Sequence, residues 1–327
     1  MARKFTTWID AWAGTRPADD LLPPRVDWLR IVPFLVLHAC VLFVFVVGVS
    51  WVAVGVAVAL YALRMFGLTA GYHRYFAHRA FKTSRLGQFC FALLGSTAVQ
   101  RGPLWWSAHH RAHHRVSDEQ ADPHSPARHG FLWSHMGWFT SRSNLRTRVE
   151  NVPDWARFPE LVWLDRFTFL PVLGLAAATY GLGALLAAVA PGLGTSGPQM
   201  LVWGFVISTV VLYQGTFTIN SLAHRWGRRR YATSDDSRNN FVLALITLGE
   251  GWHNNHHHYP AAARQGFYWW EIDLSLYALR ALALLGLVWD LKDLPPGVRE
   301  QGLLEDAEPS TPETRERLTL AEPVSTR

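Results

Sequence analysis

Cysteine is nearly absent from this chain, which has 327 residues but only two cysteines, Cys40 and Cys90. Both lie among apolar residues, and neither has a second cysteine at a spacing typical of a metal site. The sequence therefore argues against a disulfide framework and against a thiolate-bound metal. Any chemistry must come from other side chains.

Sequence fingerprints of bound redox cofactors are also lacking. No His-Pro-Gly-Gly pattern of a haem protein occurs. No Gly-rich turn stands between a predicted strand and a helix, the setting that a nicotinamide or flavin site requires. If the chain performs redox chemistry, its electrons must come from a separate protein.

Charge is missing from two long blocks, residues 31–63 and 167–223, which contain no Asp, Glu, Lys or Arg. Uncharged blocks of this length exceed any core element of a soluble domain, and a membrane-spanning helix needs about 20 residues. We therefore predict an integral membrane protein. Each block, with its flanks, is long enough for two spans, which gives two helical hairpins and four spans in total.

The turns of these hairpins are visible in the sequence. A segment rich in Pro and Gly, residues 191–198, separates predicted spans near 167–189 and 200–223. In the first block, extended by its flanks to about 29–70, a tight turn is predicted near Gly48 to Trp51. The 31 Lys and Arg avoid both turns, so the positive-inside rule places both termini and both large polar segments in the cytoplasm.

A net charge of +6 raises the question of nucleic acid. The arginines form no stripe interleaved with stacking aromatics, and the sixteen tryptophans concentrate near the predicted membrane boundaries. We therefore expect a lipid bilayer, and no nucleic acid, as the surrounding partner.

The predicted organisation has six segments. They are a cytosolic N-terminal segment (1–28), a first transmembrane hairpin (29–70), the first half of a cytosolic domain (71–166), a second transmembrane hairpin (167–223), the second half of the cytosolic domain (224–293) and a disordered tail (294–327). Within the second half of the cytosolic domain, residues 274–289 are apolar apart from Arg280 and predict an interfacial amphipathic helix.

Histidine is abundant in the predicted cytosolic segments, and eight of the fifteen histidines form three clusters. One cluster has the pattern H-x-x-x-x-H, and two have the pattern H-x-x-H-H. The eight are His73 and His78; His110, His113 and His114; and His253, His256 and His257. Because positions i, i+3 and i+4 share one face of a helix, each H-x-x-H-H pattern directs three imidazoles to one place. Metal binding is the interpretation that this pattern favours.

The number of imidazoles bears on the metal. Zinc is satisfied by four ligands, whereas eight or more imidazoles without a thiolate indicate two ions with open positions. Iron is favoured, although copper or a pair of zinc ions remains open on ligand type alone.

The histidine clusters and their flanks resemble the membrane fatty acid desaturase family, in the branch that contains stearoyl-CoA desaturases. The resemblance covers about residues 30 to 293. The matching segments include Gly71 to Lys82, Asp122-Pro-His124, Asn220-Ser-Leu-Ala-His224 and Gly249-Glu-Gly-Trp-His253. The resemblance implies an all-α membrane fold: four transmembrane helices in two hairpins, capped by a cytosolic helical domain that holds a histidine-rich di-iron site.

The resemblance also implies which side chains hold the two Fe ions. One iron would be bound by His73, His110, His114 and His257, with Asn220 completing that site through a water. The other would be bound by His78, His113, His224, His253 and His256. His124 and His135, beside Asp118 and Asp122, would orient ligands through hydrogen bonds.

The implied activity is insertion of a cis double bond, between carbons 9 and 10, into a saturated acyl-CoA with O2 as co-substrate. Hydrogen removal from an unactivated methylene needs an oxidant made from O2 at a metal, and two electrons from a ferredoxin- or cytochrome-type donor with its reductase. Acyl-CoA members of the family have an Arg-Asp pair before the second histidine cluster, where this chain has Ala108 and His109. An acyl-lipid desaturase, a related di-iron hydroxylase and a metal-binding membrane scaffold without turnover therefore remain alternatives.

Overall fold

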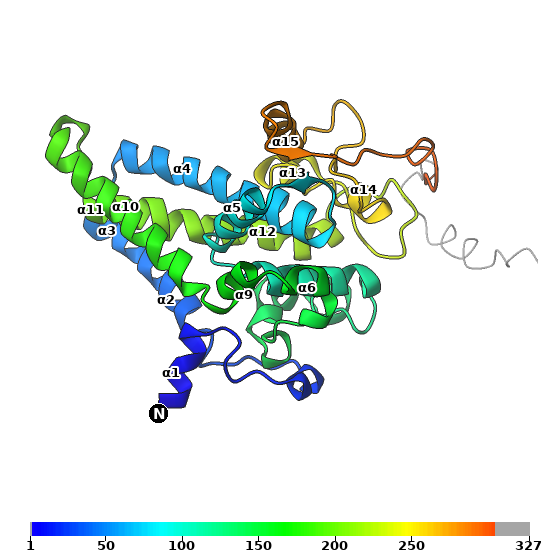
Figure 1. The fold of residues 1–327 in the computed structure, drawn as a ribbon, viewed down its shortest axis with the longest axis horizontal. Helices are drawn as coiled ribbons and strands as arrows, with labels where there is room; N and C mark the ends of the chain where they lie inside the picture. The colour runs from blue at the N-terminus through cyan, green and yellow to red at the C-terminus, as the bar shows by residue number, and fades with distance from the viewer. Residues whose placement is uncertain (1, 305–327) are drawn as a thin grey trace, which may run out of the picture.

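The structure, a computed structural model, describes residues 2–304. Residue 1 and residues 305–327 lie outside the described residues, and so does most of the segment predicted to be a disordered tail. The described chain is mostly helical, with long helices extending to one side and shorter helices gathered at the other (Figure 1).

Three described helical segments are long and apolar enough to cross a membrane: Trp51–Ala77, Phe169–Val189 and Gly197–His224. The expected first span corresponds to a shorter apolar run, Val32–Val47. Helix length alone establishes neither this fourth span nor the cytosolic position of the cap, so the four-span topology stays a prediction.

These segments are built from several elements in sequence. The first run comprises α2 (Val32–Cys40), η2 (Val41–Phe43) and α3 (Val44–Val47); it is followed by α4 (Trp51–Phe66) and the π-helix η3 (Gly67–Ala77). After α10 (Phe169–Val189) and η8 (Pro191–Leu193) come α11 (Gly197–Met200), the π-helix η9 (Leu201–Ile207), α12 (Ser208–Ser221) and η10 (Leu222–His224).

Local chemistry explains the break between α3 and α4. Gly48 has φ of 70°, a conformation that favours glycine, and α3 ends before it. The Ser50 hydroxyl then accepts a hydrogen bond from the Ala53 N–H and caps α4. The tight turn therefore lies where the sequence predicts it.

The shorter elements surround the cytosol-facing ends predicted for the spans. The N-terminal segment contains α1 (Ala2–Ile9) and η1 (Pro17–Leu21). The segment between the hairpins contains β1 (Lys82–Thr83), α5 (Arg85–Ser96), α6 (Pro103–Val116), α7 (Pro126–His129), η4 (Trp133–Gly137), η5 (Trp138–Thr140), η6 (Arg142–Asn144), η7 (Val149–Asn151), α8 (Pro153–Ala156) and α9 (Pro159–Arg166). After the second hairpin come α13 (Phe241–Ile246), α14 (His253–His258), α15 (Leu274–Leu284) and β2 (Val288–Trp289), which pairs antiparallel with β1.

One buried carboxylate fixes the start of α6, the helix that carries the second histidine cluster. Asp165, at the end of α9, accepts hydrogen bonds from the backbone N–H groups of Leu104 and Trp105 at 2.9 and 2.8 Å. These N–H groups have no partner within the helix, so the carboxylate satisfies them and complements the positive end of the helix dipole.

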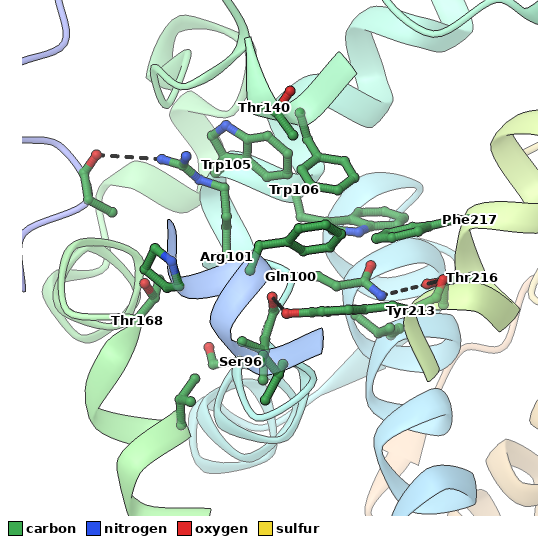
Figure 2. Close-up of a pocket in the computed structure, with 18 of the residues that line it drawn as sticks. Ser96, Gln100, Arg101, Trp105, Trp106, Thr140, Thr168, Tyr213, Thr216 and Phe217 are labelled. Atoms are coloured by element: carbon green, nitrogen blue, oxygen red, sulfur yellow. Dashed lines mark hydrogen bonds between the residues drawn. The ribbon is translucent and has the colours of Figure 1, made fainter. Parts of the chain in front are cut away.

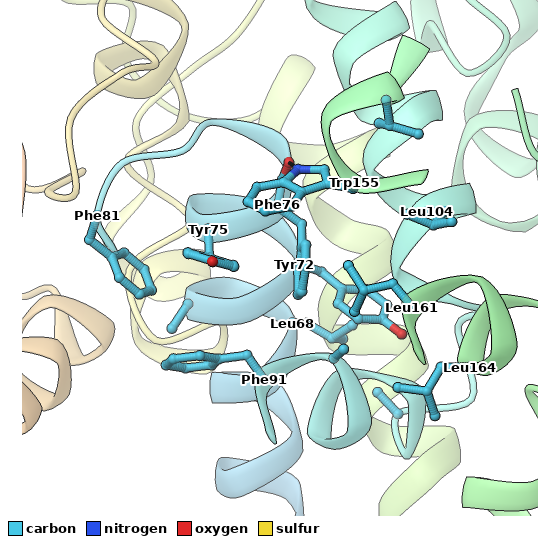
Figure 3. Close-up of a cluster of buried hydrophobic side chains, with 14 of the residues drawn as sticks. Leu68, Tyr72, Tyr75, Phe76, Phe81, Phe91, Leu104, Trp155, Leu161 and Leu164 are labelled. Carbon is cyan, nitrogen blue, oxygen red and sulfur yellow. Dashed lines mark hydrogen bonds between the residues drawn. The ribbon is translucent and has the colours of Figure 1, made fainter. Parts of the chain in front are cut away.

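An aromatic core holds η3 against the neighbouring helices. Tyr72 and Phe76 of η3 lie in one cluster with Trp155 of α8 and Leu161 of α9 (Figure 3). Tyr75 lies between Phe81 and Phe91. Burial of aromatic side chains of this size is worth about 1.5–3 kcal/mol each. The end of the second apolar helix is thereby anchored in the cap.

Residues 294–304 do not behave as the predicted disordered tail. Val298 is buried against Tyr231 and Phe267, and Leu303 forms an antiparallel bridge with Tyr231. The apolar residues Leu294 and Val298 pack into this cluster, so the packed region of the chain extends beyond residue 293.

Candidate metal centre

The π-helix η3 determines how the first histidine pair is presented. His78 N–H donates to the His73 carbonyl at 3.1 Å, five residues back, which is the hydrogen bond of a wide π turn. In an α-helix, residues five apart diverge by about 140°, whereas the wider turn brings them toward one side. The two imidazole rings accordingly lie 4.8 Å apart.

The second and third clusters are both helical, on α6 and α14. His110 and His114 are i and i+4, as are His253 and His257, and each pair lies on one face of its helix. The two helices contribute in a complementary way. The histidines of the two helices form two groups, described next. Helix α6 contributes two imidazoles to the first group and one to the second, and α14 contributes one to the first and two to the second.

Histidine group 1 contains five imidazoles whose candidate ligand atoms all lie within 4.8 Å of one another. Its members are His73, His78, His110, His114 and His256. Consecutive Nε2 atoms approach closely: His73 to His256, His256 to His114 and His114 to His110 are each 3.0 Å, and His110 to His78 is 2.9 Å.

Histidine group 2 is built around His113, His224 and His257, whose candidate ligand atoms also lie within 4.8 Å of one another. His253 joins them, since its Nε2 is 3.0 Å from the Nε2 of His224 and its ring is 4.4 Å from that of His257. Asn220, one helical turn before His224, lines the same cavity as His224; its role as a ligand through water stays a prediction.

This grouping corrects the division that the family resemblance implies. His78 and His256 lie with His73 in group 1, and His257 lies in group 2. The physical reason is the helical repeat: His253 and His257 differ by only about 40° around α14, whereas His256 is about 100° from His257 and reaches the neighbouring group. The nine histidines themselves remain the predicted ligand set.

Carboxylates hold several of these rings by Nδ1. His224 donates to Asp118 at 2.7 Å, and His113 donates to Asp122 at 3.1 Å. In the same way His257 donates to Asp235, and His73 lies against Glu250. A carboxylate can only accept, so the proton is on Nδ1 and the lone pair of Nε2 points into the group.

Burial favours the neutral form of His110, His113 and His256. It lowers the pKa of His113 to about 4, and it lowers the pKa of His110 and His256 well below the usual value, with a further decrease from neighbouring histidines. Burial alone would raise the pKa of Asp122, but the adjacent His124 and His113 lower it below its usual range. Neutral imidazoles with ionised carboxylates behind them are the form that binds metal.

The donor atoms fit metal ions. An ion that binds imidazole nitrogen at about 2.1 Å holds two ligands at right angles about 3 Å apart, which is the spacing found in group 1. In group 2, the buried Nε2 of His257 has no hydrogen-bond partner within residues 2–304, although its Nδ1 is bonded. A buried lone pair is satisfied by a bound cation.

The other histidines have separate roles. His124 donates to Asp122 at 2.7 Å and shares this carboxylate with His113, and its role in orienting a ligand stays a prediction. His135 instead links Ser221 and Gln214 of α12. His109 bonds to the Arg146 carbonyl and His258 to the Val298 carbonyl, outside both groups.

Sequence reasoning missed Asp235 and Glu250 as partners of ligand histidines. Glu250 offered a signal, because it is an acidic residue between two glycines, three positions before His253. Asp235 lies in a polar loop where nothing in the local sequence distinguishes it. It is 22 residues away from His257 in the sequence, and the fold brings the two side chains into contact.

A cavity of about 720 Å³ reaches both groups. Its lining includes His73 and His110 of group 1 and His113, His224 and His253 of group 2. From there it continues among apolar side chains of α2, α10 and η9, such as Leu37, Val172 and Phe205. The cavity has the size of a small-molecule site and is mostly apolar.

Aromatic and polar side chains shape the middle of this cavity (Figure 2). Trp105 and Trp106 both line it, and Trp106 stacks on His110 with ring centroids 4.8 Å apart. On the opposite wall the Gln100 side chain donates to Thr216 at 2.5 Å. The cavity therefore has Trp106 next to His110 and a hydrogen-bonded Gln100–Thr216 pair in its lining.

Comparison with known proteins agrees with this site. The profile of the family described as "Fatty acid desaturase" matches residues 49–287. An sn-1 stearoyl-lipid 9-desaturase of Anabaena variabilis is 37% identical over 273 residues, which cover 82% of this chain and 95% of that protein. An acyl-CoA C20 Delta5-desaturase of Anemone leveillei is 36% identical over 293 residues, covering 88% and 86%.

A Delta-9 acyl-lipid desaturase 1 of Arabidopsis thaliana is 36% identical over 272 residues, covering 82% of this chain and 84% of that protein. The family match includes every histidine of both groups. The match and the relatives make the chain an oxidoreductase of lipid metabolism with membrane helices. This chain belongs to the fatty acid desaturase family.

Proposed function

We propose that this protein is a di-iron desaturase that inserts a cis double bond between carbons 9 and 10 of a saturated acyl chain. The observation that carries the proposal is the apolar cavity that passes both histidine groups. An extended acyl chain fits such a space, and only a metal-based oxidant can remove hydrogen from its methylene groups.

Each histidine group would hold one iron, with His73, His78, His110, His114 and His256 at one ion and His113, His224, His253 and His257 at the other. Asn220 would assist through a water. The bound irons would supply the oxidising power, using O2 and two external electrons.

The protein's own residues position the substrate and protect the reaction. The walls formed by Trp105, Trp106 and Phe217 exclude water and confine the chain. The Gln100–Thr216 hydrogen bond fixes one wall of the cavity, which would limit how the acyl chain lies in it. Asp118, Asp122 and Asp235 hold their histidines in the ligating tautomer.

The acyl chain of a membrane lipid is the substrate form that the cavity favours over acyl-CoA. Its lining includes residues of three apolar elements, α2, α10 and η9, so an acyl chain can enter from the bilayer. The stearoyl-lipid relative acts on a lipid by its name, whereas the Anemone leveillei relative acts on acyl-CoA. Ala108 and His109, in place of the Arg-Asp pair, also weigh against coenzyme A.

Topology and electron supply complete the proposal. The protein would be multi-pass, with four spans and with both termini and the metal site in the cytoplasm. A ferredoxin- or cytochrome-type donor with its reductase would deliver the electrons on that side.

Expression in a desaturase-deficient host tests the proposed function. We expect a new monounsaturated acid in total fatty acids by mass spectrometry, appearing first in glycerolipids when lipid classes are separated after a short labelled pulse. Early appearance in acyl-CoA would favour the coenzyme A form. A hydroxylated product would instead indicate a hydroxylase, and bound iron without any product would indicate a scaffold.

Met65 offers a test of the cavity itself, because it lines the cavity and is fully buried. We expect Met65→Ala, which adds space, to shift the product toward longer acyl chains, and Met65→Trp to shift it toward shorter chains. Truncation of a buried methionine costs about 2–5 kcal/mol, so both variants are checked for folding. Leu93→Trp, at a partly exposed position on α5, is the control and should leave the product profile unchanged. Identical profiles in all variants would contradict this placement of the acyl chain.

A further inference from the structure

The two histidine groups differ in the charge that surrounds them. In group 2, three of the four imidazoles have an aspartate on Nδ1: Asp118 on His224, Asp122 on His113 and Asp235 on His257. The side chains of these aspartates are 7%, 0% and 5% exposed, so solvent screens them little.

No arginine or lysine neutralises these aspartates within residues 2–304, where every ion pair they form is with a histidine. The other partners of these carboxylates are neutral donors, while the Arg128 guanidinium donates to the Asp118 backbone carbonyl at 3.1 Å. Asp118 accepts from the Ser125 hydroxyl at 2.6 Å, and Asp235 accepts from the Thr233 hydroxyl at 3.0 Å. Group 2 therefore has three carboxylates directly behind its ligands.

Group 1 has a different environment. Among its five imidazoles, only His73 contacts a carboxylate within the described residues, that of Glu250. Glu250 is itself paired with the guanidinium of Arg74 at 3.2 Å, and Arg74 is 1% exposed. Arg74 also pairs with the buried Asp273 at 2.9 Å, so Glu250, Asp273 and Arg74 together carry one net negative charge beside group 1, against three at group 2.

We infer that these carboxylates make the two metal positions electronically unequal, so that an iron at group 2 is the harder of the two to reduce. This rests on the proposed function, in which each group holds one iron. A carboxylate on Nδ1 raises the basicity of an imidazole ligand, and nearby negative charge stabilises a trivalent ion more than a divalent one. At group 1, Arg74 offsets one of its two carboxylate partners, Glu250 and Asp273, so this stabilisation of a trivalent ion is smaller there.

The consequence concerns the first of the two electrons. If the diferric protein accepted one electron from a reductant, the ion held by group 1 would be the one reduced to the ferrous state. Asp118, Asp122 and Asp235 are then positioning residues that fix the oxidation state at group 2, beyond orienting their histidines.

Mössbauer spectroscopy of protein loaded with ⁵⁷Fe tests this inference. After one electron equivalent of dithionite per chain, we expect one ferric and one ferrous subspectrum of equal area. Asp235→Asn should change the ferric subspectrum, whereas Glu250→Gln should change the ferrous one. Glu160→Gln is the control, since Glu160 pairs with the exposed Arg85 and contacts neither group.

A potentiometric titration of the wild type measures the reduction potentials of the two irons and does not depend on any variant. We expect two separated one-electron steps. Asp235→Asn or Asp122→Asn should raise the reduction potential of the step that occurs at the lower potential. A single two-electron step, or a change of the ferrous subspectrum in Asp235→Asn, would overturn the inference. Iron content and product are measured first, because fewer than two irons per chain, or no unsaturated product, would count against the proposed function instead.

Discussion

Replacing His113 by alanine is expected to remove the unsaturated product. His113 is 4% exposed, contributes to group 2 from α6, and is oriented by Asp122. Loss of the hydrogen-bond partner of a metal ligand alone typically costs about 10–100-fold in affinity or activity, so loss of the ligand itself should cost at least about 100-fold. The measurement is the monounsaturated fraction of total fatty acids in a desaturase-deficient host.

His258→Ala is the matched control for this prediction. His258 lies on α14 next to His257, but its ring stacks on Tyr231 and bonds to the Val298 carbonyl. We expect this variant to keep most of its activity. If His113→Ala formed as much product as the wild type, group 2 would not be required for the reaction.

Replacing Gly251 by alanine should prevent the third histidine cluster from assembling. A Cβ at this position would lie 2.0 Å from the backbone nitrogen of Ala244 and 2.5 Å from the carbonyl carbon of Leu243. Backbone atoms of a helix cannot move away cheaply, so we expect a loss of more than about 3 kcal/mol of stability. Thermal unfolding followed by size-exclusion chromatography, together with iron content, measures the effect.

Gly174→Ala provides the comparison in α10, where a Cβ would meet no atom within 4 Å. Its effect should stay within about 1 kcal/mol. If Gly251→Ala unfolds at the same temperature as Gly174→Ala and retains its iron, the close packing between α13 and the turn before α14 does not hold the third cluster in place.

Much of the site could be predicted because it depends on local repeats. The H-x-x-H-H patterns at 110–114 and 253–257 are helical, and the helical repeat brings their imidazoles together. The same repeat also shows why the implied division of ligands was wrong: His253 and His257 are one turn apart on α14 and lie in the same group. The uncharged blocks likewise predicted the apolar helices, because each block contains enough consecutive uncharged residues to form a membrane span.

Other features depend on distant contacts or on uncommon geometry. The π turn at 73–78 cannot be read from residue spacing, because an α-helix with the same sequence would separate the two rings. Asp235 and Glu250 become partners of histidines only when loops from different regions of the chain meet. Residues 294–304 are held by Tyr231, which is more than sixty residues away in sequence, so composition alone predicted disorder there.

The most direct test of two metal positions is the iron content of the purified protein and of the His113→Ala variant, measured by mass spectrometry on folded monodisperse material. The account predicts two irons per chain in the wild type, two in His258→Ala and one in His113→Ala, because group 1 keeps all five of its imidazoles. A single iron in the wild type, or complete loss of both ions in His113→Ala with group 1 still folded, would contradict two separate groups that each hold one ion.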